Sequence, residues 1–129
     1  MTLDSSYCFV CGSKNPKSLK IKVFYENGIA KTYYSFPPEY QGWKGFIHGG
    51  IIATLLDEIM AYAAGQLGPT MTIHLNITFR QALHPNEKVI VSGWIENKTN
   101  RKVETKAEMR RIIDNKIIAT AEGVLLFVK

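Results

Sequence analysis

The sequence lacks two features that would connect it with a membrane. Its longest apolar stretch, residues 51–64, is interrupted by Asp57 and Glu58, so it is too short and too polar for a transmembrane helix. The N-terminal residues MTLDSSYCFVCG have neither the basic start nor the apolar core of a signal peptide. We therefore expect no membrane partner and a cytoplasmic location.

Cysteine is also scarce, with Cys8 and Cys11 in the sequence CFVC. A complete structural zinc site would need two further ligands nearby, and His48, His74 and His84 occur in three different contexts. We expect reduced structural thiols, no catalytic metal and no cofactor. A zinc site within one chain, or one shared between two subunits, stays open as an alternative.

The formal net charge of +5 admits an anionic partner but does not identify one. Basic residues are dispersed among acidic ones in KSLKIK, NKTNRK and EMRR, without a recognition-helix pattern or an aromatic RNA-binding motif. This dispersion favours solvated strand surfaces. We expect no nucleic-acid partner.

The length and composition indicate one folded domain. The chain has 129 residues, of which 46% are hydrophobic and 21% are charged, the balance of a globular protein with a single core. We assign residues 1–129 to one domain. Residues 1–17, with Cys, Gly, Asn and Pro in CGSKNPK, are expected to form an irregular lead-in.

The first half of the sequence predicts a hairpin followed by a long helix. Two β-rich runs in residues 18–36 are joined at Asn27-Gly28, the strongest short hairpin signal, and residues 37–45 form a Pro- and Gly-rich loop. From Gly49 to about Gln66, apolar residues recur at helical spacing. This helix would be roughly 27 Å long and apolar around most of its circumference, so other elements must cover it.

Four later runs have the two-residue period of strands, at residues 71–80, 87–97, 101–112 and 116–128. The apolar face of the first run is expected to pack on the helix; it comprises Met71, Ile73, Leu75, Ile77 and Phe79. Residues of alternating charge form the outer face of the third run: Lys102, Glu104, Lys106, Glu108 and Arg110. The order of elements predicts an α+β fold with an antiparallel sheet against the helix.

The stretch HGGIIATLLDE, residues 48–58, resembles the H-G-G and L-x-D signature of hotdog-fold acyl-CoA thioesterases of the phenylacetyl-CoA (PaaI-type) branch. CFVCGSKNP and YQGWKGFIHGG also resemble the segments that precede the helix in some members. The resemblance implies a hotdog fold, in which a curved antiparallel sheet wraps around one long central helix. It also implies an acyl-CoA substrate, of which coenzyme A is a part.

The resemblance also implies roles for individual residues. Asp57 matches the catalytic acid position, Gly49 the backbone donor to the oxyanion, and Thr72 a hydroxyl residue that helps to place water or substrate. Relatives of the human type carry Asn six residues before the histidine, where this chain has Gly42 beside Gln41. We treat these two residues as candidate substrate contacts.

The residues themselves support a ligand site at the helix start. The N–H groups of Gly49 and Gly50 are free donors of the first turn at the positive end of the helix dipole, and no side chain keeps a ligand away. The glycines could equally serve close packing of the helix on a strand. His48 could be a general base, but we prefer a role in orienting the chain that enters the helix.

Gly49 and Asp57 lie about 12 Å apart along one helix, so they cannot serve the same carbonyl within one chain. Two antiparallel central helices in a homodimer would bring Gly49 of one subunit to Asp57 of the other, and dimers could pair into tetramers. A structural hydrogen bond is the alternative role for Asp57. Glu58 points about 100° away, and a surface or inter-subunit ion pair is its preferred role.

Several cations could contact the phosphates of coenzyme A, although solvated turn charges are the simpler interpretation for each of them: Arg80, Lys98, Arg101 and Lys102. We predict hydrolysis of an acyl-CoA thioester, with the acyl group undetermined. A non-catalytic acyl-CoA binding module is the alternative. A hydratase fits poorly, because it needs a histidine paired with a carboxylate in another arrangement.

Overall fold

The computed structural model describes residues 3–128. Its regular elements, in chain order, are β1 (Phe24–Glu26), β2 (Ile29–Ser35), the 3-10 helix η1 (Pro38–Tyr40), α1 (Gly49–Gly65), β3 (Thr70–Phe79), β4 (Lys88–Lys98), β5 (Lys102–Arg111) and β6 (Ile117–Phe127). Within residues 3–128, no helix has the length and apolar character needed to cross a membrane.

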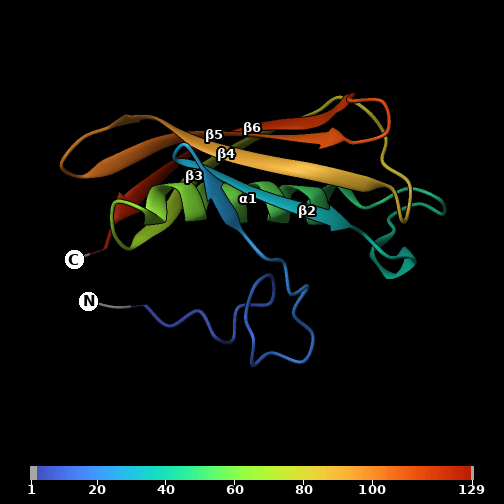
Figure 1. Ribbon diagram of the computed structural model, residues 1–129, viewed down its shortest axis with the longest axis horizontal. Coiled ribbons are helices and arrows are strands. Elements are labelled where there is room, and N and C mark those ends of the chain that lie inside the picture. The colour runs from blue at the N-terminus through green and yellow to red at the C-terminus, as the bar shows by residue number, and fades with distance from the viewer. Residues whose placement is uncertain (1–2, 129) are drawn as a thin grey trace.

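The six strands form one antiparallel sheet in the order β1-β2-β4-β5-β6-β3. Helix α1 lies along one face of this sheet, and the N-terminal segment, residues 3–23, lies on the side of the helix away from the sheet (Figure 1). The helix is therefore a middle layer, and its apolar residues are covered from both sides.

The hairpin at Asn27-Gly28 is confirmed, but its first strand is shorter than expected. Both turn residues have positive φ (53° and 80°), as a two-residue type I′ turn requires. Residues 18–22 are not a strand, because their backbone pairs with the N-terminal segment: Leu19 N–H donates to the Phe9 carbonyl at 2.8 Å and Ile21 N–H to the Val10 carbonyl at 3.2 Å.

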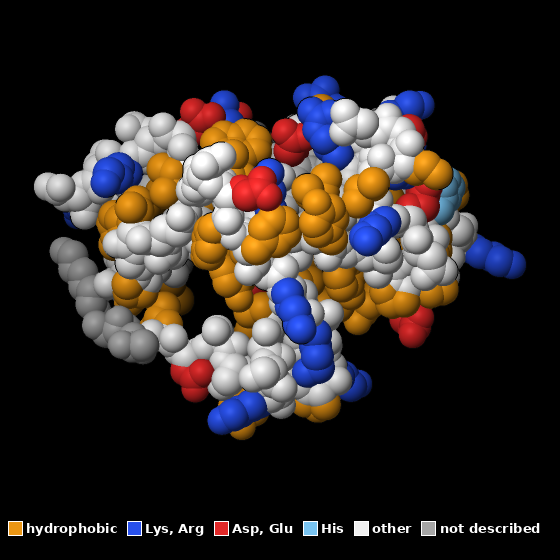
Figure 2. Space-filling model, in the orientation of Figure 1, with side chains coloured by type: hydrophobic (Ala, Val, Ile, Leu, Met, Phe, Trp, Pro, Cys, Tyr) orange, Lys and Arg blue, Asp and Glu red, His pale blue; other side chains and the backbone are white. Residues whose placement is uncertain are grey.

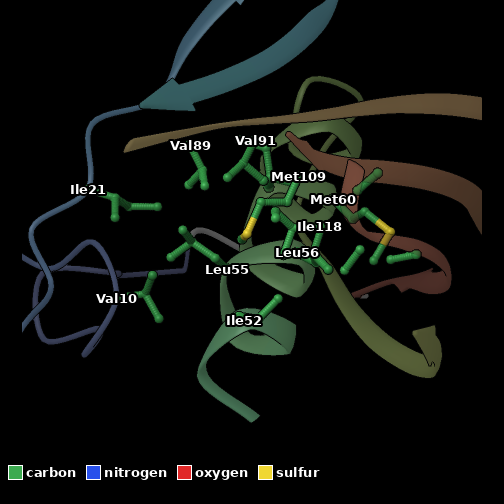
Figure 3. Packing of buried hydrophobic residues seen from close by; sticks show 14 of the residues in the cluster. Val10, Ile21, Ile52, Leu55, Leu56, Met60, Val89, Val91, Met109 and Ile118 are labelled. Carbon is green, nitrogen blue, oxygen red and sulfur yellow. The ribbon is translucent and has the colours of Figure 1, made fainter. Parts of the chain in front are cut away.

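The predicted helix is confirmed as α1, and its apolar residues form the centre of the core. Ile52, Leu55, Leu56, Ile59, Met60, Ala63 and Ala64 are buried. Figure 3 shows Leu55, Leu56 and Met60 close to Val91, Met109 and Ile118 of three strands. Val10 and Ile21 approach from the N-terminal segment and complete the same cluster.

A glycine in β4 lets the helix approach the sheet closely. A Cβ atom at Gly93 would lie 2.9 Å from the backbone oxygen of Ile59 and 3.0 Å from its carbonyl carbon. Real Cβ atoms essentially never come so near to backbone atoms, so any side chain here would push α1 away from the sheet.

Strand β3 differs from the sequence-based expectation, because its apolar residues do not all lie on the face that packs on the helix. Met71, Ile73 and Phe79 are 63%, 58% and 53% exposed. The register with β6 shifts between Thr72 and His74, which marks a β-bulge. The bulge reverses the side on which alternate residues point, so a uniform alternation over residues 71–80 was the wrong prediction.

The charged outer face of β5 is confirmed. Val103, Thr105, Ala107 and Met109 are buried, and the residues between them point outward. Lys102 Nζ lies 3.8 Å from Glu104 Oε1, and Lys106 Nζ lies 3.9 Å from Oε1 of Glu96 in the neighbouring strand β4. On the face drawn in Figure 2, Lys and Arg side chains are scattered among Asp and Glu.

Replacing Gly93 with Ala should destabilise the fold. The added methyl group has no space against Ile59, and overpacking of this kind costs about 1–3 kcal/mol. Urea denaturation followed by circular dichroism measures the free energy of unfolding. Gly65→Ala is the control, because a Cβ placed there has no atom within 4 Å apart from its chain neighbours and the backbone of α1. Equal losses in both variants would contradict the close approach.

Candidate functional site

His48 caps the start of α1. Its Nδ1 accepts a hydrogen bond from Gly50 N–H at 2.8 Å, and its carbonyl accepts from Ile51 N–H and Ile52 N–H at 3.1 and 3.3 Å. The His48 N–H donates to the Tyr40 carbonyl at 2.9 Å, which fixes the loop that precedes the helix. These contacts match the orienting role preferred from the sequence.

The two glycines after His48 differ in their hydrogen bonding. Gly50 N–H is occupied by the His48 ring, so it is not available to a ligand while this cap is in place. Gly49 N–H has no hydrogen-bond partner among residues 3–128. It is therefore the free donor at the positive end of the helix dipole.

Gly49 lies at the border of two hollows in the surface, of about 350 and about 310 Å³, and Phe46 and Ile47 line both. A Cβ atom at Gly49 would lie 3.3 Å from the ring of Phe79, which also lines the larger hollow. The absence of a side chain at Gly49 therefore serves close packing and access to the N–H group at once.

Gln41 and Gly42 build the loop beside the helix start. The Gln41 Nε2 donates to the Pro38 carbonyl at 2.8 Å, and its Oε1 accepts from Gly45 N–H, so both ends of the amide hold the loop. A Cβ atom at Gly42 would lie 3.3 Å from Cδ2 of His48. In this arrangement Gly42 makes room for the capping histidine, and Gln41 shapes the loop.

A hydrogen bond from strand β3 fixes the carboxylate of Asp57. Thr72 Oγ1 donates a hydrogen bond of 2.9 Å to Asp57 Oδ1. Thr72 reaches the helix because it pairs with the buried Leu125, whereas beyond the bulge Leu75, Ile77 and Phe79 take the inner face. The second carboxylate oxygen of Asp57 accepts no hydrogen bond from residues 3–128 and remains free for another donor.

The candidate phosphate-binding residues lie at opposite ends of the sheet. Arg80 lines the 350 Å³ hollow together with Gly49. Arg101 and Lys102 follow the turn at the other end, where Phe127 N–H donates to the Arg101 carbonyl and Lys102 pairs with Leu126. Lys98 pairs with Val103 at that same end. A single chain therefore does not gather these cations at the helix start.

Glu58 faces the N-terminal segment, although the sequence suggested a surface or inter-subunit ion pair. Its Oε2 lies 3.5 Å from Cys8 Sγ, and it forms no ion pair within residues 3–128. Burial, together with a hydrogen bond to Glu58, raises the pKa of the Cys11 thiol to about 12. Burial, followed by contact with Cys11, also raises the pKa of Tyr62. No motif in the sequence links Glu58 to Cys8 and Cys11, because even Cys11 lies 47 positions before it.

A curved antiparallel sheet around one central helix defines the hotdog class of proteins, as the sequence predicted. Residues 44–118, more than half of the chain, match the sequence profile of the Thioesterase superfamily. The chain belongs to this superfamily.

Solved structures of low sequence identity share the fold. Thioesterase superfamily member 2 of zebra fish superposes with a TM-score of 0.82 at 18% identity, covering 96% of this chain and 94% of its own. The E. coli PaaI protein of the phenylacetic acid degradation operon superposes with a TM-score of 0.81 at 17% identity, covering 88% and 83%. Identities this low establish the fold alone.

In sequence, the chain is similar to the acyl-coenzyme A thioesterase THEM4 of Bos taurus. The two are 26% identical over an alignment of 129 positions, which covers 98% of this chain and 53% of the bovine protein. The chain therefore spans about half the length of this relative.

Replacing His48 with Ala should destabilise α1, because the Gly50 N–H then loses its partner. Loss of an N-cap side chain costs about 1 kcal/mol. His48→Asn supplies another good capping group and should recover most of that loss. Thermal denaturation of both variants measures the effect. If His48→Ala were as stable as the unmodified protein, the ring would not be acting as a cap.

Proposed function

We propose that this protein hydrolyses an acyl-CoA thioester to a free acid and coenzyme A. The observation that carries the proposal is a pair of polar groups on α1 that have no hydrogen-bond partner within residues 3–128. They are the N–H of Gly49 and Oδ2 of Asp57. The other carboxylate oxygen of Asp57 accepts a hydrogen bond from Thr72 at 2.9 Å. One group can stabilise negative charge on oxygen, and the other can accept a proton. Membership of the Thioesterase superfamily and the likeness to an acyl-CoA thioesterase support the same reaction.

The reaction needs both groups at one thioester carbonyl. Water attacks the carbonyl carbon while Asp57 Oδ2 takes its proton, and the carbonyl oxygen becomes an oxyanion that accepts the hydrogen bond of Gly49 N–H. The tetrahedral intermediate then collapses, the carbon–sulfur bond breaks, and the proton on Asp57 passes to the departing thiolate. Alternatively, Asp57 itself attacks the carbonyl, the carbon–sulfur bond breaks and coenzyme A leaves as a thiolate, so that an anhydride forms. Water then cleaves the anhydride, which releases the acid and Asp57, and a proton of that water passes to the thiolate.

This chemistry requires a second copy of the chain. Gly49 and Asp57 are separated by about 12 Å along α1, so the two groups must come from two subunits with antiparallel helices. Strand β3 offers a surface for this pairing, because within residues 3–128 it is hydrogen-bonded to β6 along one edge alone. Its exposed Met71, Ile73 and Phe79 would be buried by a partner strand.

An antiparallel pairing of two β3 strands would also assemble the cations. The Thr70 end of one strand would lie beside the Phe79 end of the other, so Arg101 and Lys102 would approach the partner's Gly49. Arg80 adjoins that helix start from its own chain. Three cations would then face a polyanionic coenzyme A, for which arginine is well suited.

Four further expectations from the sequence remain predictions. They are the assignment of residues 1–129 to one domain, the cytoplasmic location, the absence of a cofactor and the absence of a nucleic-acid partner.

Asp57→Asn is the direct test of hydrolysis. The amide keeps the shape of the side chain and its contact with Thr72, but it cannot take up a proton. Turnover should therefore fall by about 10²-fold or more. Glu58→Gln is the matched control one residue away and should cost much less. Turnover is measured on a panel of short, medium, long and aromatic acyl-CoAs, with the fold checked by circular dichroism.

A different outcome would change the function. If Asp57→Asn hydrolysed its best acyl-CoA at nearly the unmodified rate, Asp57 would be a structural hydrogen-bonding group. If the unmodified protein bound acyl-CoA in calorimetry but turned over none of the panel, the fold would serve as an acyl-CoA binding module. His48→Asn separates the cap from general-base chemistry, and it should retain turnover.

Ile73→Lys tests the composite site. A buried, unpaired lysine in the proposed interface should convert the dimer to a monomer and remove turnover together with the dimer. Ile113→Lys is the control, because Ile113 is 88% exposed in the turn between β5 and β6. Sedimentation velocity at micromolar concentration measures the oligomeric state. A stable monomer with full activity would refute the requirement for two subunits.

A further inference from the structure

A second group of reactive side chains lies on the side of α1 away from the sheet. Cys8 and Cys11 of the N-terminal segment meet Glu58 of the helix, and their sulfur and carboxylate atoms all lie within 4.8 Å of one another. All three residues are partly buried. Figure 1 shows the N-terminal segment passing along this side of the helix, opposite the strands. The proposed hydrolysis uses none of these residues.

The turn that carries the two cysteines is tightly closed. Gly12 N–H donates to the Cys8 carbonyl at 2.7 Å, and Val10 N–H donates to Cys8 Sγ at 3.4 Å. A Cβ atom at Gly12 would lie 2.5 Å from backbone atoms of Cys8 and Ser6, so a glycine is required here. The order Cys-x-x-Cys-Gly thus brings both sulfur atoms to one point, and a backbone amide supports one of them as a thiolate would need.

Glu58 is left without a compensating charge. No lysine, arginine or histidine of residues 3–128 forms an ion pair with it. The Cys8 thiol donates a hydrogen bond to its Oε2, and a cation that replaces this proton would gain the thiolate and the carboxylate as ligands together. The cluster also opens on a hollow of about 570 Å³ lined by Tyr25, Tyr62 and Thr70, through which an ion and a water molecule can enter.

We propose that Cys8, Cys11 and Glu58 bind one zinc ion, with water as the fourth ligand. Two thiolates and a carboxylate are ligands that zinc accepts, and C-x-x-C is a frequent spacing in zinc sites. Tetrahedral bonds of about 2.3 Å to sulfur and 2.0 Å to oxygen place these two ligand atoms about 3.5 Å apart. The distance from Cys8 Sγ to Glu58 Oε2 is 3.5 Å. The sequence suggested too few ligands because Glu58 lies 47 positions beyond Cys11.

The ion would fasten the N-terminal segment to the middle of α1. That segment supplies Val10 and Ile21 to the core, so a link at residues 8 and 11 stabilises the cover on this side of the helix. The role is structural, because Asp57 points about 100° away around the helix toward Thr72. The inference is independent of the proposed hydrolysis, and zinc removal is expected to act on stability first.

The experiment measures metal content and metal binding in the full chain. The protein is purified without a histidine tag, in a reductant that does not bind metals, and zinc is counted by mass spectrometry. We expect about one zinc per chain. After removal of zinc with a chelator, added Co²⁺ should produce the intense thiolate-to-cobalt absorption band, and added Zn²⁺ should abolish it and raise the melting temperature by about 5–10 °C.

Single variants assign the ligands. Cys8→Ser, Cys11→Ser and Glu58→Gln should each lower the amount of bound zinc. Each variant should also need at least a tenfold higher zinc concentration to reach the same rise in melting temperature. Glu39→Gln, an exposed carboxylate in η1, is the control and should bind zinc as the unmodified protein does. Circular dichroism checks that each variant is folded, and Glu58→Gln keeps the test valid if the cysteine variants do not fold.

Two results would overturn the proposal. One is an unmodified protein that contains no zinc, gives no cobalt absorption band and reacts with thiol reagents equally fast with and without added zinc. The other is a zinc site that is lost in both cysteine variants but unchanged in Glu58→Gln, which would exclude the helix as a ligand and with it the link to α1.

Discussion

Burial of α1 on two sides is the constraint on which the rest of the structure depends. The sheet covers one side, where Gly93 allows the helix backbone to approach, and the N-terminal segment covers the other with Val10 and Ile21. Polar groups on such a helix are costly unless another element satisfies them. The helix start, Asp57 and Glu58 each meet a different element: the loop that ends at His48, strand β3, and the turn at Cys8.

The bulge in β3 connects the fold with the candidate site and with the strand edge proposed for pairing. A regular strand would have turned Thr72 to the same side as Asn76 and Thr78, away from the helix. The register shift turns Thr72 inward to Asp57 and leaves Met71 and Ile73 exposed at the edge of the sheet. One extra residue in the strand thus fixes the carboxylate and produces the apolar edge that a second subunit would cover.

The two adjacent carboxylates of α1 have separate surroundings because successive helical residues point about 100° apart. Asp57 faces the sheet edge and has one oxygen fixed by a hydroxyl group, which suits a group that must exchange a proton. Glu58 faces two thiols, and that of Cys8 donates a hydrogen bond to it. A single helical turn therefore places its two carboxylates in two different surroundings, and a change at either residue need not disturb the other.

The sequence by itself determined the elements with strong local signals. The hairpin follows from the positive φ that Asn27-Gly28 accepts, α1 from its helical apolar period, and the outer face of β5 from its alternating charges. The orienting role of His48 follows from its position directly ahead of the helix. The choice of Asp57 and Thr72 as candidate functional residues follows from the resemblance of the sequence to a family.

Only the tertiary structure decided the remaining features, because they depend on residues far apart in the chain. The β3 bulge is a matter of register with β6, the early end of the first hairpin strand follows from pairing with residues 9 and 10, and the use of Gly50 N–H follows from the orientation of the His48 ring. The meeting of Glu58 with Cys8 and Cys11 has the same origin. Local sequence patterns report which side of an element is apolar, and they do not report which distant element covers it.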